Sequence, residues 1–264
     1  MFWNLVKVEF RRHFWFFTFM IAVNTISSVM ILNDYNFIHS YGFQIEQYSW
    51  LLCFIYVFIN IYRELYIGKN TIAHMIPIDT YKILIVKSVV FGVFMSIMWL
   101  VTLIYEMFSP MGMYEMRIIE SSNVLESTLY FIIPRIVSLF TGVVVIGLAV
   151  ALGKLVNNRV ISNVIVFASF ILITMGIYMV MKYTFLNVDG IGWSIGTTAQ
   201  YGFKQYSGII AILVSTPKSI LLGEVNIASS IYWNNVFVNI FVGLIGLYIS
   251  NLVFKSKKYE LIGK

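Results

Sequence analysis

Residues 62–87 read YRELYIGKNTIAHMIPIDTYKILIVK and form a polar stretch between two long apolar runs. The stretch contains basic and acidic side chains, a histidine, a glycine and a proline, although only 11% of the whole chain is charged. Apolar runs of such length predict membrane-crossing helices, because about 20 apolar residues span the hydrocarbon core. The polar stretch is therefore expected to be a connector at one face of a membrane.

Composition agrees with a membrane protein. The chain has 264 residues, of which 59% are hydrophobic, against about 45–50% in an ordinary soluble domain. No segment has the composition of a separate soluble domain, so we predict one all-α membrane domain, residues 1–264. Its six predicted spans cover residues 14–32, 48–62, 88–105, 129–153, 160–181 and 234–254.

Two segments outside the spans are predicted to lie at the membrane surface. In residues 1–13, Asn4, Lys7 and Arg11 recur at spacings of three and four, which predicts an amphipathic interfacial helix. In residues 182–233, the apolar core 208–215 is too short to cross the membrane. This region is expected to form a re-entrant or interfacial element between spans 5 and 6.

The distribution of Lys and Arg predicts the orientation. If both termini lie on one side, that side carries all but five of the 18 basic residues, and the five are Arg117, Arg135, Lys182, Lys204 and Lys218. Because Lys and Arg accumulate in cytoplasmic loops, both termini and residues 63–87 are predicted to be cytoplasmic in a multi-pass cell-membrane protein. The basic residues lie beside apolar runs, which argues for topology rather than nucleic-acid binding.

Several kinds of chemistry lack the residues that they need. The central parts of the predicted spans contain no Asp, Glu, Lys, Arg or His, which disfavours ion-coupled transport. His13, His39 and His74 lie on different segments without metal-ligand spacing, so no metal or catalytic site is predicted. Polar residues inside the spans are expected to form hydrogen bonds between helices; among them are Asn24, Asn60, Thr102, Ser162, Asn163, Thr174 and Asn239.

Residues 147–154 read GLAVALGK, which is superficially like a nucleotide-binding loop. The glycines are one residue too far apart, and Leu155 stands where Ser or Thr is required. We therefore predict no cofactor on this chain. Gly147, Ala149, Ala151 and Gly153 are instead expected to permit close helix packing.

The motif Arg63-Glu64, followed by Gly68, Thr71, the run MIPI at 75–78 and Lys87, resembles the segment between the second and third helices of ABC-2 type transporter permeases. These permeases are the membrane subunits of one group of ABC exporters. The six predicted spans, the interfacial helix and the extracellular element before span 6 are also similar to that family. The specific part of the resemblance is confined to residues 63–87.

The resemblance implies a coupling helix that contacts a separate cytoplasmic ATPase subunit, which binds ATP and Mg²⁺, while this chain is not itself an enzyme. The residues implied at or near this contact are Glu64, Gly68, Lys69, Asn70, Thr71, His74 and Met75. Residues 154–159, with Lys154 and Arg159 at their ends, would form a smaller contact. A second permease subunit, identical or related, is expected to complete the pathway.

The implied cargo is an amphipathic peptide or another apolar molecule. The chain is similar to permeases that export such peptides, as the staphylococcal exporter of phenol-soluble modulins does, or that confer resistance to antimicrobial peptides. Two other hypotheses stay open: a membrane sensor, immunity or assembly protein that binds peptides through residues 182–233 without transporting them, and a membrane-embedded enzyme.

Overall fold

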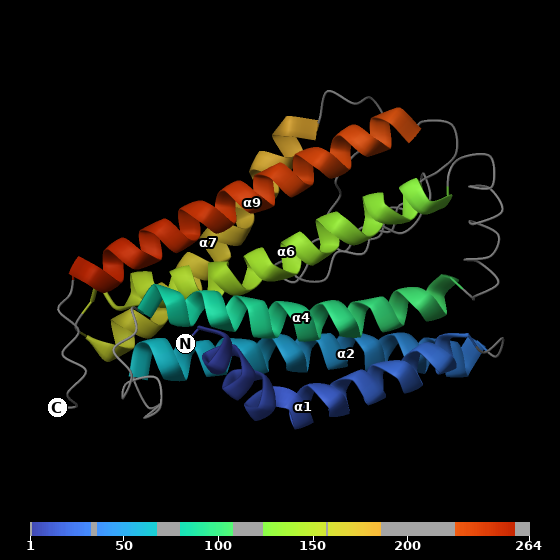
Figure 1. The fold of residues 1–264 in the computed structure, drawn as a ribbon, viewed down its shortest axis with the longest axis horizontal. Helices are drawn as coiled ribbons and strands as arrows, with labels where there is room; N and C mark the ends of the chain where they lie inside the picture. The colour runs from blue at the N-terminus through green and yellow to red at the C-terminus, as the bar shows by residue number, and fades with distance from the viewer. Residues whose placement is uncertain are drawn as a thin grey trace.

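The computed structural model describes residues 2–32, 36–67, 80–107, 124–156, 158–185 and 225–256. They form α1 (Phe2–Ile31), α2 (Asn36–Ile61), the π-helical segment η1 (Tyr62–Ile67) that continues α2, α4 (Thr80–Met107), α6 (Val124–Gly153), α7 (Arg159–Phe185) and α9 (Val225–Ser256) (Figure 1). Six of these helices are long and apolar enough to cross a membrane, and the described residues contain no strand. The prediction of an all-helical protein with six possible spans is confirmed.

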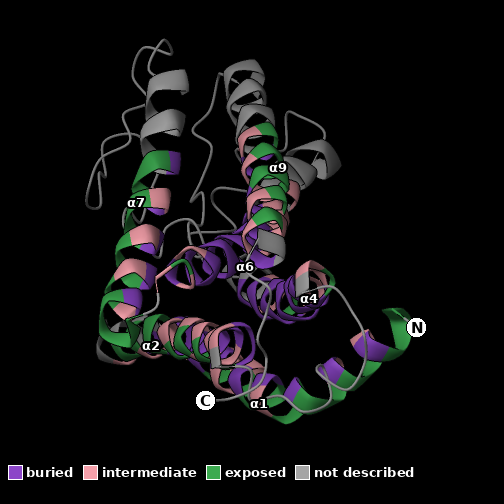
Figure 2. Cartoon of the chain, turned by 90° about the vertical axis from the view of Figure 1, so that its left-hand side faces the viewer, coloured by how far each residue is buried: buried purple, intermediate pink, exposed green. Residues whose placement is uncertain are grey.

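The helices form three layers, with α4 and α6 in the middle (Figure 1). α1 and α2 lie on one side of this pair, and α7 and α9 lie on the other. Most residues of the segments Tyr81–Thr102 of α4 and Ile136–Gly153 of α6 are buried, whereas each outer helix keeps an exposed apolar face (Figure 2). Extended apolar surfaces of this kind contact a membrane or another protein, so the arrangement is that expected of a multi-pass membrane protein.

Glycines bring the helices of the middle layer close together. A Cβ atom on Gly92 of α4 would lie 2.8 Å from the ring of Phe140 on α6, and one on Gly147 of α6 would lie 2.3 Å from Leu84 on α4. One on Gly153 would meet Val166 of α7 at 2.3 Å. The predicted close packing at Gly147 and Gly153 is confirmed.

A buried polar group joins α1, α2 and α4. The Asn24 amide nitrogen donates hydrogen bonds to the Met98 carbonyl oxygen at 3.2 Å and to the Thr102 hydroxyl oxygen, while the Ser49 hydroxyl donates to the Asn24 side-chain oxygen at 3.2 Å. The predicted interhelical role is confirmed for Asn24 and Thr102. It is wrong for Asn60 and Thr174, whose side chains donate to carbonyl oxygens of their own helices.

Aromatic rings also pack α1 against its neighbours. The ring of Phe94 on α4 lies between those of Phe10 and Phe17, with centroid distances of 4.3 and 4.6 Å and nearly parallel planes. Phe16 stacks on Tyr56 of α2 at 3.6 Å. These contacts pack α1 against both α2 and α4.

The helices extend beyond several predicted boundaries. Residues 1–13 do not form a separate helix, since α1 runs without interruption from Phe2 to Ile31 and bends (Figures 1 and 2). Asn4, Lys7 and Arg11, predicted to share a polar face, are all exposed. α2 begins at Asn36, within the predicted first loop, and η1 and the first turns of α4 occupy both ends of the predicted connector 63–87.

The predicted re-entrant region 182–233 is similarly shortened. α7 continues to Phe185 and α9 begins at Val225, and the intervening residues lie outside the described part of the chain.

α1, α4 and α7 begin, and η1, α6 and α9 end, at one end of the molecule (Figure 1). We call this the N-terminal end of the bundle.

Gly42 lies where the backbones of α1 and α2 come close together, so we expect that a larger residue there destabilises the protein. A Cβ atom on Gly42 of α2 would lie 2.9 Å from both the Ile31 amide nitrogen and the Ser27 carbonyl oxygen of α1, and backbone cannot move aside as a side chain can. Gly42→Ala is therefore expected to lower the free energy of unfolding by about 1–3 kcal/mol. Thermal unfolding of the purified protein in detergent measures the change.

Gly176→Ala is the matched control, because nothing lies within 4 Å of a Cβ atom there. It removes a glycine from a helix interior and should raise stability by up to about 1 kcal/mol. Equal unfolding temperatures for both variants would contradict the close approach of α1 and α2.

Candidate functional site

Ionisable side chains from four helical segments meet inside the N-terminal end of the bundle. α1 contributes three of them, while α2, η1 and α4 contribute one each. We call this group the charge cluster; it consists of Glu9, Arg12, His13, Tyr56, Glu64 and Lys87.

Lys87 is the centre of the charge cluster. Its side chain is 1% exposed, and its ammonium nitrogen lies 2.8 Å from Oε2 of Glu64 and donates a hydrogen bond to Oε2 of Glu9. Both carboxylates are also buried. An unpaired charge in such an environment is very unfavourable, so Lys87 requires carboxylates from α1 and η1 in these positions.

Arg12 supplies the second positive charge, at the edge of the charge cluster. Its Nη1 atom lies 2.5 Å from Oε1 of Glu64 and 3.6 Å from Oε1 of Glu9, and its side chain is 40% exposed. The two carboxylates are thus balanced by one ammonium and one guanidinium group. Each carboxylate faces both bases, which makes the cluster a network rather than two separate pairs.

His13 and Tyr56 extend the network toward α2. His13 Nε2 lies 3.1 Å from Oε2 of Glu9, and Nδ1 lies 2.8 Å from the Tyr56 hydroxyl oxygen. Nε2 also lies 3.3 Å from the Lys87 ammonium nitrogen, so it faces both an acid and a base of the cluster. The imidazole thus links Glu9 and Lys87 to Tyr56 of α2.

Helix geometry explains how these side chains converge. Glu9, Arg12 and His13 are spaced three and four residues apart, which places them on one face of α1. Glu64 lies in η1, where π-helical geometry changes the angular spacing between successive side chains. In this segment Glu64 is buried, while the preceding Arg63 is exposed.

η1 also contacts α6 and α7, the two helices that a short turn joins at this end of the bundle. The Tyr62 hydroxyl donates a hydrogen bond of 2.5 Å to the side-chain oxygen of Asn163 on α7, and η1 packs against α6. The side-chain oxygen of Asn158 accepts hydrogen bonds from the first amides of α7, and the Ser162 hydroxyl donates to the Gly153 carbonyl oxygen at 2.5 Å. The first turns of α7 are therefore joined both to the end of α6 and to η1, and the interhelical roles predicted for Ser162 and Asn163 are confirmed.

The structure locates three of the predicted contact residues. Glu64 is buried in the charge cluster, Lys154 is half-buried in the turn after α6, and Arg159 is exposed at the start of α7. The other six lie outside the described residues, between the end of η1 and the start of α4; they are Gly68, Lys69, Asn70, Thr71, His74 and Met75. Their proposed roles stay predictions.

Sequence reasoning did not predict the charge cluster. It assigned Lys87 to the connector, whereas Lys87 lies in the third helical turn of α4 and is buried. Two features of the sequence were consistent with it: the spacing of Glu9, Arg12 and His13, and the position of Lys87 between apolar residues, with Ser88 before the next apolar run. Neither identifies the partner helix.

Comparisons of the chain with protein-family models, with curated proteins and with solved structures find no match. The site is therefore interpreted from its own geometry. Among the described residues, no group of His, Cys, Asp and Glu side chains is arranged to hold a metal ion. What the charge cluster can do directly is hold α1, η1 and α4 together at the two ends of residues 68–79.

The central position of Lys87 predicts a large effect on stability. Lys87→Met leaves two buried carboxylates without their ammonium partner and should reduce the free energy of unfolding by about 3–5 kcal/mol. Lys82→Met, a change of the same type at an exposed position of the same helix, should alter it by less than about 0.5 kcal/mol. Chemical unfolding in detergent distinguishes the two.

A double-mutant cycle tests whether Lys87 acts through Glu64. Because Glu64→Gln removes one carboxylate that Lys87→Met would leave unpaired, the double variant should be more stable than the sum of the single changes predicts, by about 0.5–3 kcal/mol. Strict additivity would show that the two side chains do not interact.

Proposed function

We propose that this chain is a membrane-spanning permease subunit of an ATP-driven ABC exporter, in which residues 68–79 contact a separate cytoplasmic ATPase. The observation that carries the proposal is that ion pairs centred on the buried Lys87 join the two ends of that connector to each other and to α1. The resemblance of residues 63–87 to the ABC-2 type permeases supplies the identity of the partner. ATP and Mg²⁺ would bind on the ATPase.

The ion pairs support a mechanical role for the connector. Glu64 lies three residues before the end of η1, and Lys87 lies seven residues after the start of α4. Ion pairs away from water are much stronger than exposed pairs. A force on the connector would therefore move η1 and α4 together, and Arg12 and Glu9 would transmit the movement to α1.

The position of the turn between α6 and α7 supports one contact surface for the ATPase, shared by this turn and the connector. Lys154 and Arg159 flank the turn between α6 and α7, and η1 contacts α7 through Tyr62 and Asn163, at the end of the bundle where η1 ends and α4 begins. One cytoplasmic partner could thus reach both segments. The excess of basic residues predicts that this end faces the cytoplasm.

Burial changes the role that we propose for Glu64. Resemblance implied that it lies at or near the ATPase contact, but its carboxylate faces Arg12 and Lys87. We assign to it the transmission of movement rather than direct binding. Direct contacts are then left to the connector, from Gly68 to Met75, and to Lys154 and Arg159.

The exposed faces of the outer helices support two further parts of the proposal, a second permease subunit and an apolar cargo. α1, α2, α7 and α9 expose large apolar side chains, which offers surface both for lipid and for a second permease subunit, identical or related. An amphipathic peptide or another apolar molecule would be a suitable cargo for a pathway with such walls. The second subunit and the cargo belong to the proposal and follow from the resemblance.

Replacing residues 69–75 by a Gly/Ser linker of equal length should reduce the amount of ATPase that co-purifies with the chain by about tenfold or more. The amount of ATPase recovered with the tagged chain and its vanadate-sensitive ATP hydrolysis are the two measurements. The control is the same replacement of residues 109–115, in the connection between α4 and α6. An unchanged complex after the first replacement would exclude the proposed contact.

Glu64→Gln should have a different effect, because the side chain is inside the bundle. We expect the ATPase to stay bound, while the stimulation of ATP hydrolysis by cargo in reconstituted vesicles falls severalfold. Arg63→Gln, at the adjacent exposed position, should leave both quantities unchanged. Release of the ATPase by Glu64→Gln alone would make Glu64 a contact residue and contradict its transmitting role.

A further inference from the structure

The outward face of α1 carries two cations between two tryptophans. Trp3, Lys7, Arg11 and Trp15 recur at every fourth position and are all exposed, and we call them the basic face. We propose that the basic face binds the headgroup of an anionic phospholipid. This inference does not depend on the proposed transport function, because it concerns α1 alone.

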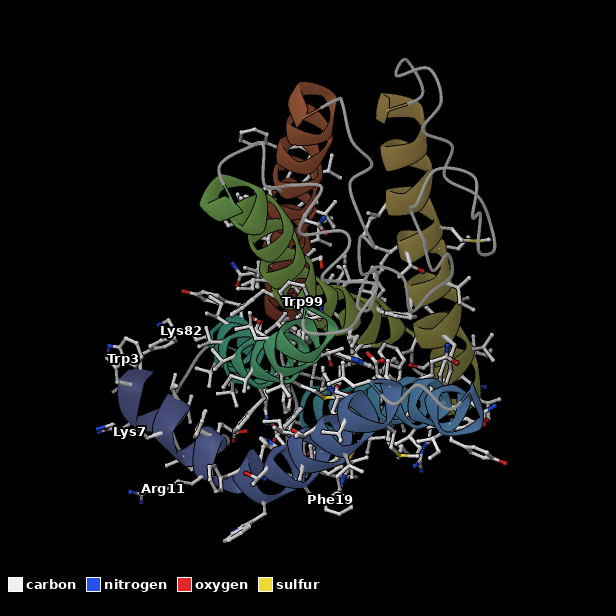
Figure 3. The ribbon with its side chains drawn as sticks, turned by 90° about the vertical axis from the view of Figure 1, so that its right-hand side faces the viewer. Trp3, Lys7, Arg11, Phe19, Lys82 and Trp99 are labelled. Carbon is white, nitrogen blue, oxygen red and sulfur yellow. The ribbon has the colours of Figure 1, made fainter. Side chains whose placement is uncertain are left out.

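The basic face is separate from the charge cluster. With about 100° between successive residues, Lys7 and Arg11 lie on the side of α1 opposite Glu9 and His13. In Figure 3, Trp3, Lys7 and Arg11 point away from the other helices. Neither Lys7 nor Arg11 forms an ion pair with another described residue, whereas Glu9 is already engaged by Lys87, Arg12 and His13. Within the described part of the chain, the positive charge of this face is therefore not compensated by an acidic side chain.

The length of α1 places this charge at the level of the headgroups. A helix of 30 residues is about 45 Å long, while the hydrocarbon core is about 30 Å thick. The last 18 or so residues of α1 are mostly apolar, contain no charged side chain and are enough to fill most of the core. The first ten, which include Lys7 and Arg11, then extend beyond it, with Trp15 close to the boundary.

The side chains around the two cations favour lipid over an acidic protein as the ligand. Trp3 and Trp15 are 70% and 79% exposed, and Phe14 and Phe19 are exposed beside them. Tryptophan is enriched where a membrane protein meets the headgroups. Lys7 and Arg11 are about 6 Å apart along the helix axis, so both can approach the phosphate of one lipid. A net negative headgroup is preferred because no acid on this face would attract the amine of a zwitterionic lipid.

Native mass spectrometry of the full chain, titrated in detergent with phosphatidylglycerol or phosphatidylcholine, tests the proposal. Each cation near an anionic lipid surface contributes about fivefold in affinity, so Lys7→Gln with Arg11→Gln should weaken phosphatidylglycerol binding by about 25-fold. Phosphatidylcholine binding should change little. The single change Arg11→Gln, with an expected loss of about fivefold, serves if the double variant is poorly folded.

The matched control is Arg63→Gln with Lys82→Gln, which removes the same charge from exposed positions at the same end of the bundle. It should keep its phosphatidylglycerol affinity. An equal loss in both double variants would mean that only the overall charge matters and would overturn the proposal. Unchanged lipid binding by the first variant, together with release of a co-purifying protein, would assign the face to a protein and also overturn it.

Discussion

A lysine ammonium group in the interior of a membrane bundle must be surrounded by acceptors, and this requirement organises the N-terminal end of the molecule. Lys87 satisfies it with Glu9 and Glu64, and Arg12 balances the second negative charge. The requirement explains why the first turns of α1 are not a separate surface helix. They must stay against α4, because Glu9 has no comparable partner on the outer side of α1.

The remaining contacts are of a different kind. Away from the charge cluster, the helices meet through glycines that allow side chains or backbone to approach, through stacked rings, and through the Asn24 amide. The Asn24 hydrogen bonds are directional, whereas the glycine and ring contacts depend on the fit of apolar surfaces. The ion pairs have stricter geometry, and we infer that they select the rotational setting of α1 and η1 relative to α4.

Local properties of the sequence were enough to predict the six helices, the close contacts at Gly147 and Gly153, and the interhelical hydrogen bonding of Asn24 and of Thr102, but not that these two residues are partners. The charge cluster was not predictable in this way, because it depends on which faces of distant helices meet. Lys82 and Lys87 were read as part of a connector, although the helix already begins at Thr80. Asn60 and Thr174 were misassigned because short polar side chains also reach carbonyl oxygens in their own helix.

The two rings that enclose Phe94 restrict how α1 can move. Phe10 and Phe17 are two helical turns apart, so sliding α1 along α4 would separate both stacks, whereas a tilt about Phe94 would preserve them. Glu9 lies on one side of this pivot and Asn24 on the other. A tilt that draws Glu9 toward the connector therefore moves the Asn24 end of α1 in the opposite direction, as the two arms of a lever move.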